Sequence, residues 1–156
     1  MTSSLSLDQP VPAFTATATS GVTVDSEALR GRRYVLYFYP KDHTPGCTTE
    51  GGDFRDLHQQ FHAANCEVFG VSRDSLRTHE NFKAKQGFPF ELISDPDETL
   101  CRLFDVMQLK KLYGREYMGI DRSTFLIDEQ GVLRQQWRKV KVPGHAAAVL
   151  EALQAL

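Results

Sequence analysis

One uninterrupted run of strand-forming residues constrains the fold more than any other stretch of the chain. Residues Tyr34 to Tyr39 are all apolar or aromatic, and Pro40 ends the run. A strand without polar alternation is typical of a sheet covered on both faces, as in α/β proteins. A short loop then leads to Cys47, which opens a segment of helical periodicity. The sequence therefore predicts a buried strand that delivers one thiol to the start of a helix.

The remaining periodicity predicts a mixed central β-sheet flanked by helices, in a single α/β domain over residues 1–156. An N-terminal β-hairpin is expected where two strand-like segments flank Ser20-Gly21. A polar arm is expected over residues 1–12 and an irregular excursion over residues 105–121. The other expected strands cover residues 67–72, 90–94, 123–128 and 132–140, and the expected helices cover residues 47–64, 74–86, 95–104 and 144–156.

Composition argues against several classes of partner and setting. The formal net charge is −2, which gives no overall basic field for nucleic acid. The longest apolar run is far short of the ~20 residues that span a bilayer. Residues 1–6 lack the basic start and apolar core of a signal peptide. The chain has three cysteines, an odd number that does not fit a small disulfide scaffold. These features favour a reducing cytoplasm, with neither nucleic acid nor membrane as a partner.

Cys47 follows Thr-Pro-Gly at a helix start, which favours an anion such as a thiolate. An ordinary thiol is only a few per cent ionised at neutral pH, and making the thiolate dominant requires about 3.4 kcal/mol. A helix N-terminus supplies ~0.3–1 kcal/mol, and at most ~2 kcal/mol. A cation is therefore needed. Arg122, just before the expected strand 123–128, is the best candidate, because at ~4 Å it could contribute up to ~4 kcal/mol.

Other residues near the thiol and elsewhere can be weighed in the same way. Thr44 is a loop hydroxyl three residues before the cysteine, able to donate a hydrogen bond to a thiolate and to accept one from a substrate proton. Cys66 and Cys101 lie in apolar surroundings and are expected to be packed, inert thiols. Position 50 holds Glu50, so the second thiol of a Cys-x-x-Cys exchanger is missing.

Three alternative functions remain open at this point. A thiol-disulfide reductase is disfavoured by the missing partner thiol. A cysteine hydrolase would need a base such as His43 or His58 beside the thiol. A metal-binding protein would use His58 and His62, which are four residues apart on one helix face, but no third ligand is near them in the sequence.

The segment Pro40-Lys41-Asp42-His43-Thr44-Pro45-Gly46-Cys47, joined to the downstream Arg122-Ser123-Thr124-Phe125, resembles the peroxiredoxins. It is most similar to the bacterioferritin comigratory protein (peroxiredoxin Q) subfamily, and the match spans nearly the whole chain. The resemblance implies a thioredoxin-like fold with Cys47 as the peroxidatic cysteine. Thr44 and Arg122 would hold a hydroperoxide, and Pro40 would shield the thiolate. No metal or organic cofactor is implied.

The chain departs from this subfamily at the resolving cysteine. Many members carry that thiol where this chain has Gly52, and others carry it at the position that matches Lys83. We therefore expect a one-cysteine mechanism in which an external thiol of the thioredoxin, glutaredoxin or low-molecular-weight kind reduces the oxidised Cys47. The alternative is that Cys66 or Cys101 acts as an atypical resolving cysteine. The resemblance favours a monomer.

Overall fold

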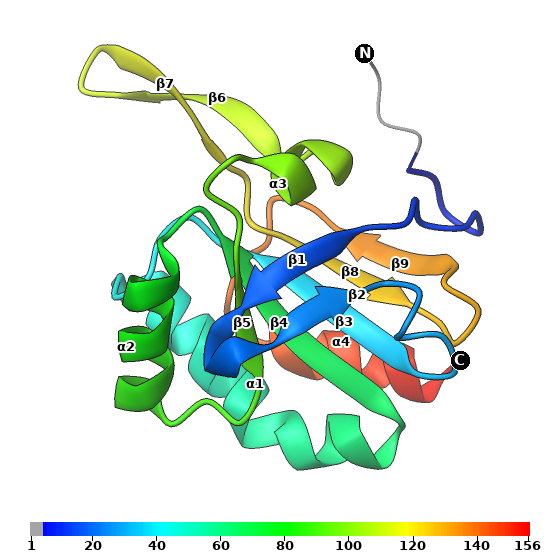
Figure 1. Cartoon of the computed structure of the whole chain (residues 1–156). Coiled ribbons are helices and arrows are strands. Elements are labelled where there is room, and N and C mark those ends of the chain that lie inside the picture. Colours follow the sequence, from blue (N-terminus) through cyan, green and yellow to red (C-terminus); the bar gives the residue numbers. More distant parts are fainter. Residues whose placement is uncertain (1–4) are drawn as a thin grey trace.

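A seven-stranded mixed sheet forms the centre of the molecule, in the order β2-β1-β5-β4-β3-β8-β9 (Figure 1). The computed structural model describes residues 5–156, so residues 1–4 of the predicted arm lie outside the described part. Strands β3, β4 and β5 are parallel, and the other neighbours are antiparallel. The strands are β1 Thr15–Ala18, β2 Thr23–Asp25, β3 Arg33–Phe38, β4 Cys66–Ser72, β5 Glu91–Ser94, β8 Ser123–Ile127 and β9 Leu133–Trp137.

Strand β3 is buried on both faces, as its apolar run predicted. The side chains at positions 34, 36 and 38 join one hydrophobic core, and those at 35 and 37, with Tyr39 after the strand, join the other. Each of these six side chains is at most 2% exposed. The central strand therefore belongs to both cores, and its carboxyl end is fixed by packing from two sides.

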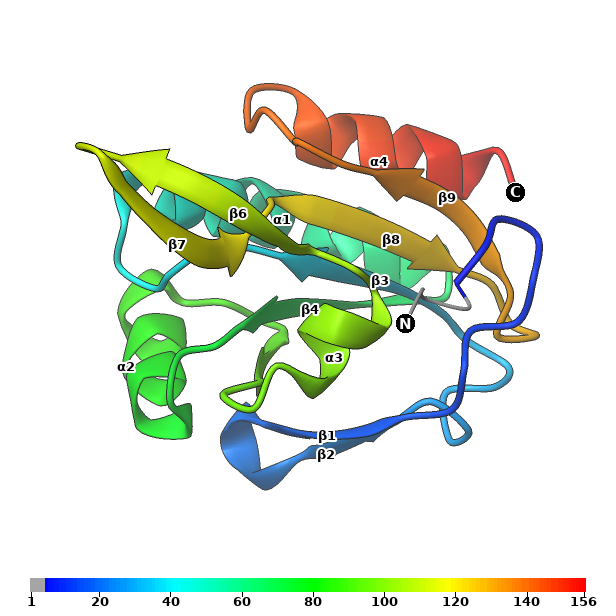
Figure 2. The same cartoon turned by 90° about the horizontal axis from the view of Figure 1, so that it is seen from above.

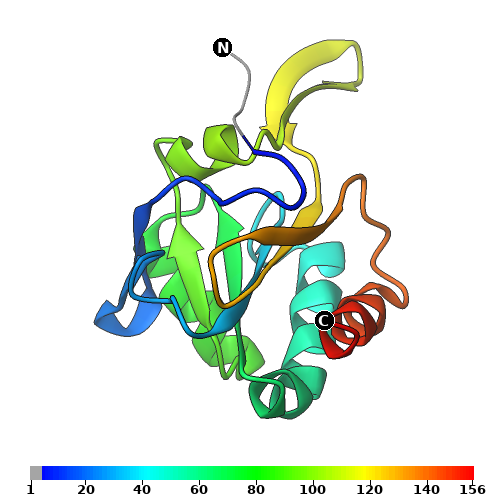
Figure 3. The ribbon, with the colours of Figure 1, turned by 90° about the vertical axis from the view of Figure 1, so that its right-hand side faces the viewer.

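Helices cover both faces of this sheet. The helices are α1 Pro45–Ala63, α2 Leu76–Gln86, α3 Thr99–Leu103 and α4 His145–Gln154. Helices α1, α2 and α4 supply one core, and α3 supplies the other together with the segment before β1. Figure 3 shows α1 and α4 side by side on the same face. Among the described residues, no helix combines the length and the apolar character needed to cross a membrane.

Most predicted boundaries agree with the structure, but two do not. The β1–β2 hairpin forms as predicted, and α2, which was predicted over residues 74–86, is capped by Ser75 and closed by Gly87 in the left-handed conformation. The prediction that a helix starts at Asp95 was wrong, because Glu98 is left-handed (φ 63°) and α3 begins after it. Likewise, the strand predicted over residues 132–140 ends at Trp137, two residues before the left-handed Lys139.

Residues 107–120 form a regular antiparallel hairpin, so the predicted irregular excursion was wrong. Strands β6 Met107–Leu112 and β7 Arg115–Ile120 pair with each other along their length. This hairpin extends away from the body of the molecule in Figures 1 and 3, and Figure 2 shows it from above. Its large apolar side chains at positions 109, 112, 113, 117 and 118 are exposed. Without a buried face the hairpin gives no apolar–polar alternation in the sequence, which explains the wrong prediction.

Candidate active site

Cys47 lies in the first turn of α1, directly beyond the carboxyl end of β3. Pro45 occupies the start of the helix, where its missing N–H costs nothing and its fixed φ suits the helical turn. Thr44 precedes it in an extended conformation as the N-cap residue. The Cys47 side chain is only 1% exposed. The thiol therefore sits at the positive end of a helix dipole and away from bulk water.

Arg122 reaches this thiol from the neighbouring strand. Strand β8 runs antiparallel to β3 with Phe38 opposite Ser123, and this register brings the residue before β8 to the carboxyl end of β3. The Arg122 Nη2 group donates to the Cys47 Sγ atom at 3.4 Å. The structure thus brings together two residues that are 75 positions apart in the sequence. A guanidinium at this distance stabilises a thiolate over a thiol.

Glu50 is a third member of the site, and sequence reasoning considered its position only as one that lacks a thiol. Arg122 Nη1 donates to Glu50 Oε1 at 2.6 Å, and Glu50 is 1% exposed. Burial raises the pKa of Glu50 to about 7, although Arg122 acts to lower it. Its other oxygen, Oε2, has no hydrogen-bond partner within residues 5–156. The three-residue spacing from Cys47 was the available signal, because residues i and i+3 share a helix face.

Thr44 and Pro40 lie on the loop between β3 and α1. The Thr44 hydroxyl donates to the Lys41 carbonyl oxygen at 2.8 Å, so its proton is directed into the loop. The lone pairs of its oxygen remain able to accept a hydrogen bond from a bound molecule. Pro40 is half-buried at the start of the loop.

The structure separates the other two thiols from Cys47. Cys66 opens β4 and pairs with Arg33 at the amino end of β3, roughly 16 Å along the strand from its carboxyl end. Cys101 lies on α3 and belongs to the core on the opposite face. Burial raises the pKa of Cys66 to about 12 and also raises the pKa of Cys101. Both thiols are buried, and neither forms a disulfide.

The histidines considered for a hydrolase or a metal site are His43, His58 and His62. Among the contacts of the described residues, none joins these side chains to the Cys47 thiol. The ring of His43 packs edge-on against Phe82 at 5.0 Å. His58 and His62 stack on each other along α1 at 6.4 Å, and burial lowers the pKa of His58. Neither arrangement supplies a base for a cysteine hydrolase.

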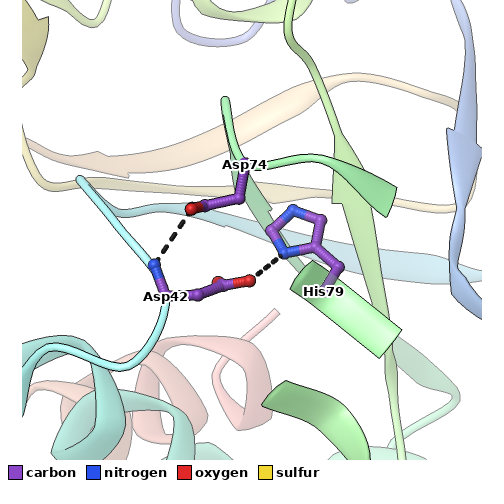
Figure 4. A group of neighbouring side chains, drawn as sticks. All are labelled: Asp42, Asp74 and His79. Atoms are coloured by element: carbon purple, nitrogen blue, oxygen red, sulfur yellow. Dashed lines mark hydrogen bonds and ion pairs between the residues drawn. The ribbon is translucent and has the colours of Figure 1, made fainter. Parts of the chain in front are cut away.

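A buried polar cluster beside the site was missed by sequence reasoning. Asp42, Asp74 and His79 place their polar atoms within 4.8 Å of one another (Figure 4). These atoms are already engaged: His79 Nδ1 bonds Asp42 Oδ2, and Asp74 Oδ2 accepts from the Asp42 backbone N–H. They therefore form a hydrogen-bonded network within the protein, and we assign no metal to it.

Comparison with known proteins identifies similar sequences. The sequence pattern of the AhpC/TSA family matches residues 7–136. The protein named peroxiredoxin Bcp from Xanthomonas campestris pv. campestris is 56% identical over 135 residues, covering 86% of this chain and 84% of that protein. Peroxiredoxin Bcp from Bacillus subtilis is 48% identical over 150 residues, covering 96% of each.

Solved structures give the same result for the fold. The bacterioferritin comigratory protein of Xanthomonas campestris, studied for its alkyl peroxide reduction activity, superposes with a TM-score of 0.90. The two chains are 50% identical, and the match covers 99% of this chain and 98% of the other. The predicted thioredoxin-like fold is confirmed by this match.

Proposed function

The chain belongs to the AhpC/TSA family, and from that premise we propose a one-cysteine peroxidase cycle centred on Cys47. It is a thiol-dependent peroxidase, as are its relatives named peroxiredoxin Bcp. Its substrate is a hydroperoxide, and its reductant is a thiol. The observation that carries the proposed residue roles is the buried Cys47 sulfur with a guanidinium nitrogen at 3.4 Å.

In the first half of the cycle, the Cys47 thiolate attacks the terminal oxygen of the hydroperoxide. The S–O bond forms as the O–O bond breaks, giving a sulfenic acid and an alkoxide or hydroxide. The sulfur loses two electrons to the peroxide, and the leaving oxygen takes a proton from solvent to become an alcohol or water. Arg122 stabilises the thiolate and the charge that develops on the leaving oxygen.

Thr44 and Pro40 have supporting roles in this step. The Thr44 oxygen accepts a hydrogen bond from the O–H group of the hydroperoxide and so orients the O–O bond, because its own proton is donated to the Lys41 carbonyl oxygen. Pro40, half-buried beside the helix start, keeps water from the thiolate.

In the second half, an external thiol attacks the sulfenic sulfur and releases water, and a second thiol then frees Cys47 from the mixed disulfide. The placement of Cys66 and Cys101 supports this route, because a disulfide needs Cα atoms within about 7 Å of each other. The reductant is of the thioredoxin, glutaredoxin or low-molecular-weight kind, and we propose a cytoplasmic monomer.

The double variant Cys66→Ser, Cys101→Ser tests the one-cysteine cycle. Peroxidase turnover with dithiothreitol and with a thioredoxin system should stay within about twofold of the parent, because neither thiol takes part. Cys47→Ser is the matched control and should abolish turnover. Loss of turnover in the double variant, with the first oxidation of Cys47 preserved, would show that one of the two is a resolving cysteine.

A further inference from the structure

The loop that carries the substrate-binding residues has one buried side chain. Of residues 40–46, only Asp42 is buried, at 3% exposure, whereas its neighbours Lys41 and His43 are exposed. The Asp42 carboxylate accepts from the Tyr39 hydroxyl at 2.6 Å through Oδ1 and faces His79 Nδ1 at 2.6 Å through Oδ2. Removing either bond would leave a buried carboxylate oxygen without its partner, which is costly.

His79 faces hydrogen-bond acceptors on both sides of its ring. It is fully buried on α2, with Nδ1 at the Asp42 carboxylate and Nε2 at 2.9 Å from the Ile93 carbonyl oxygen. The Ser72 hydroxyl, 3.5 Å from Nε2, gives its proton to Asp74. The two ring nitrogens of His79 thus join the loop, through Asp42, to the backbone of β5.

The residues behind His79 are hydrogen-bonded to one another and lie outside the loop. Asp74 Oδ2 accepts from the Asp42 backbone N–H at 3.0 Å, as Figure 4 shows, and its backbone carbonyl accepts from the Ser94 hydroxyl at 2.6 Å. These partners come from α2, β5 and the segment that follows β4. The carboxyl edge of the parallel strands thus holds the loop through Asp42.

We infer that His79 is a positioning residue for peroxide reduction and acts through Asp42. The paired side chains hold the loop so that Thr44 and the start of α1 face the same point as Arg122. His43, the residue after Asp42, is held in the left-handed conformation (φ 63°), a state that persists only where its surroundings enforce it. The inference rests on the proposed role of Cys47, and it adds a residue that touches neither the sulfur nor the substrate.

A double-mutant cycle tests this coupling. The rate constant for oxidation of Cys47 by hydrogen peroxide is measured in the parent, in His79→Phe, in Asp42→Asn and in the double variant. Each single change should lower the rate roughly 10- to 100-fold, because small misplacements of reacting groups have effects of this size. The double variant should be within about twofold of the slower single variant, because both changes release the same loop.

Two controls separate positioning from loss of stability. Asp128 is a buried carboxylate that accepts from the Gln130 and Val132 backbone N–H groups at the opposite end of β8. Asp128→Asn should lower the free energy of unfolding but leave the oxidation rate within about twofold of the parent. Alkylation by iodoacetamide, which needs no alignment of an O–O bond, should not slow in His79→Phe.

Several results would overturn the inference. These are a His79→Phe rate within about twofold of the parent, or single effects that multiply in the double variant. If His79→Phe does not fold, Asp42→Asn alone decides, because it weakens the same pairing: an oxidation rate 10- to 100-fold below the parent supports the inference, and a rate within about twofold of the parent contradicts it. A parent protein that is not oxidised at Cys47 would instead refute the proposed function.

Discussion

Glu50→Gln should change how the stability of the protein depends on pH. The Glu50 carboxylate is buried against Arg122, and burial raises its pKa from 4.5 to about 7. Gln keeps a side-chain oxygen that can accept from Arg122, but it cannot ionise. The substitution therefore removes one titration and preserves the hydrogen bond that orients the guanidinium.

The sign and size of the effect follow from proton linkage. Between pH 4.5 and about 7 the folded protein keeps the Glu50 proton that the unfolded chain has lost, so the free energy of unfolding falls as the pH rises. The pKa difference of Glu50 is 7 − 4.5 = 2.5 units. At 1.36 kcal/mol per unit this is about 3 kcal/mol. The contribution of Glu50 to the free energy of unfolding is present in full below pH 4.5 and is lost above pH 7.

Urea denaturation of parent and variant at pH 4.5 and pH 8 measures this term. The stability of Glu50→Gln relative to the parent should increase by about 3 kcal/mol between the two values, because all other titrations cancel in the difference. Glu98→Gln is a control, because hydrogen bonds from Arg73 and Arg102 lower the pKa of Glu98, so that its contribution to stability is lost only below pH 4.5 and the parent–variant difference should hardly change between pH 4.5 and pH 8. A parent–variant difference for Glu50 that does not depend on pH would refute the reasoning.

Two further predictions concern the guanidinium and the paired glycines. Arg122→Gln removes the cation 3.4 Å from the Cys47 sulfur and should slow its oxidation roughly 10²- to 10³-fold in stopped-flow measurements; an unchanged rate would assign this work to another group. Gly51→Ala should destabilise the protein by roughly 1–3 kcal/mol, because its Cβ would lie 2.4 Å from the Phe88 ring. Gly52→Ala should stabilise the protein by up to about 1 kcal/mol, because the added Cβ would meet only the flexible end of the Arg55 side chain, at 3.4 Å. The free energy of unfolding is measured by urea denaturation, and equal changes in the two glycine variants would contradict this packing.

Local sequence patterns were sufficient to predict the central strand and the position of the thiol. The run ending at Tyr39 has no polar interruption, and Pro45 marks the helix start, so strand, loop and helix were all visible in one stretch. Arg122 could be predicted because a helix N-terminus alone does not supply the free energy needed to ionise the thiol, so a cation was required. The strand that follows Arg122 was also visible in the sequence. The register that brings it to the sulfur came only with the structure.

Residues whose roles depend on tertiary contacts could not be predicted. Asp42 reads as an exposed loop residue, and nothing in the spacing connects it to His79, 37 positions away. Glu50 shares a helix face with the thiol, but its burial against Arg122 depends on how α1 meets β8. The hydrogen bonds of the buried polar network depend on tertiary contacts, and sequence periodicity does not predict such contacts.

Titration of the reduced protein with hydrogen peroxide tests the central claim most directly. Free thiol is followed during the titration, and the site of oxidation is read by mass spectrometry with a sulfenic-acid trap. The account predicts rapid loss of one thiol per chain, with the trapped sulfenic acid confined to Cys47 and with Cys66 and Cys101 unmodified. Oxidation of Cys47 no faster than that of free cysteine, or oxidation spread over all three thiols, would contradict it.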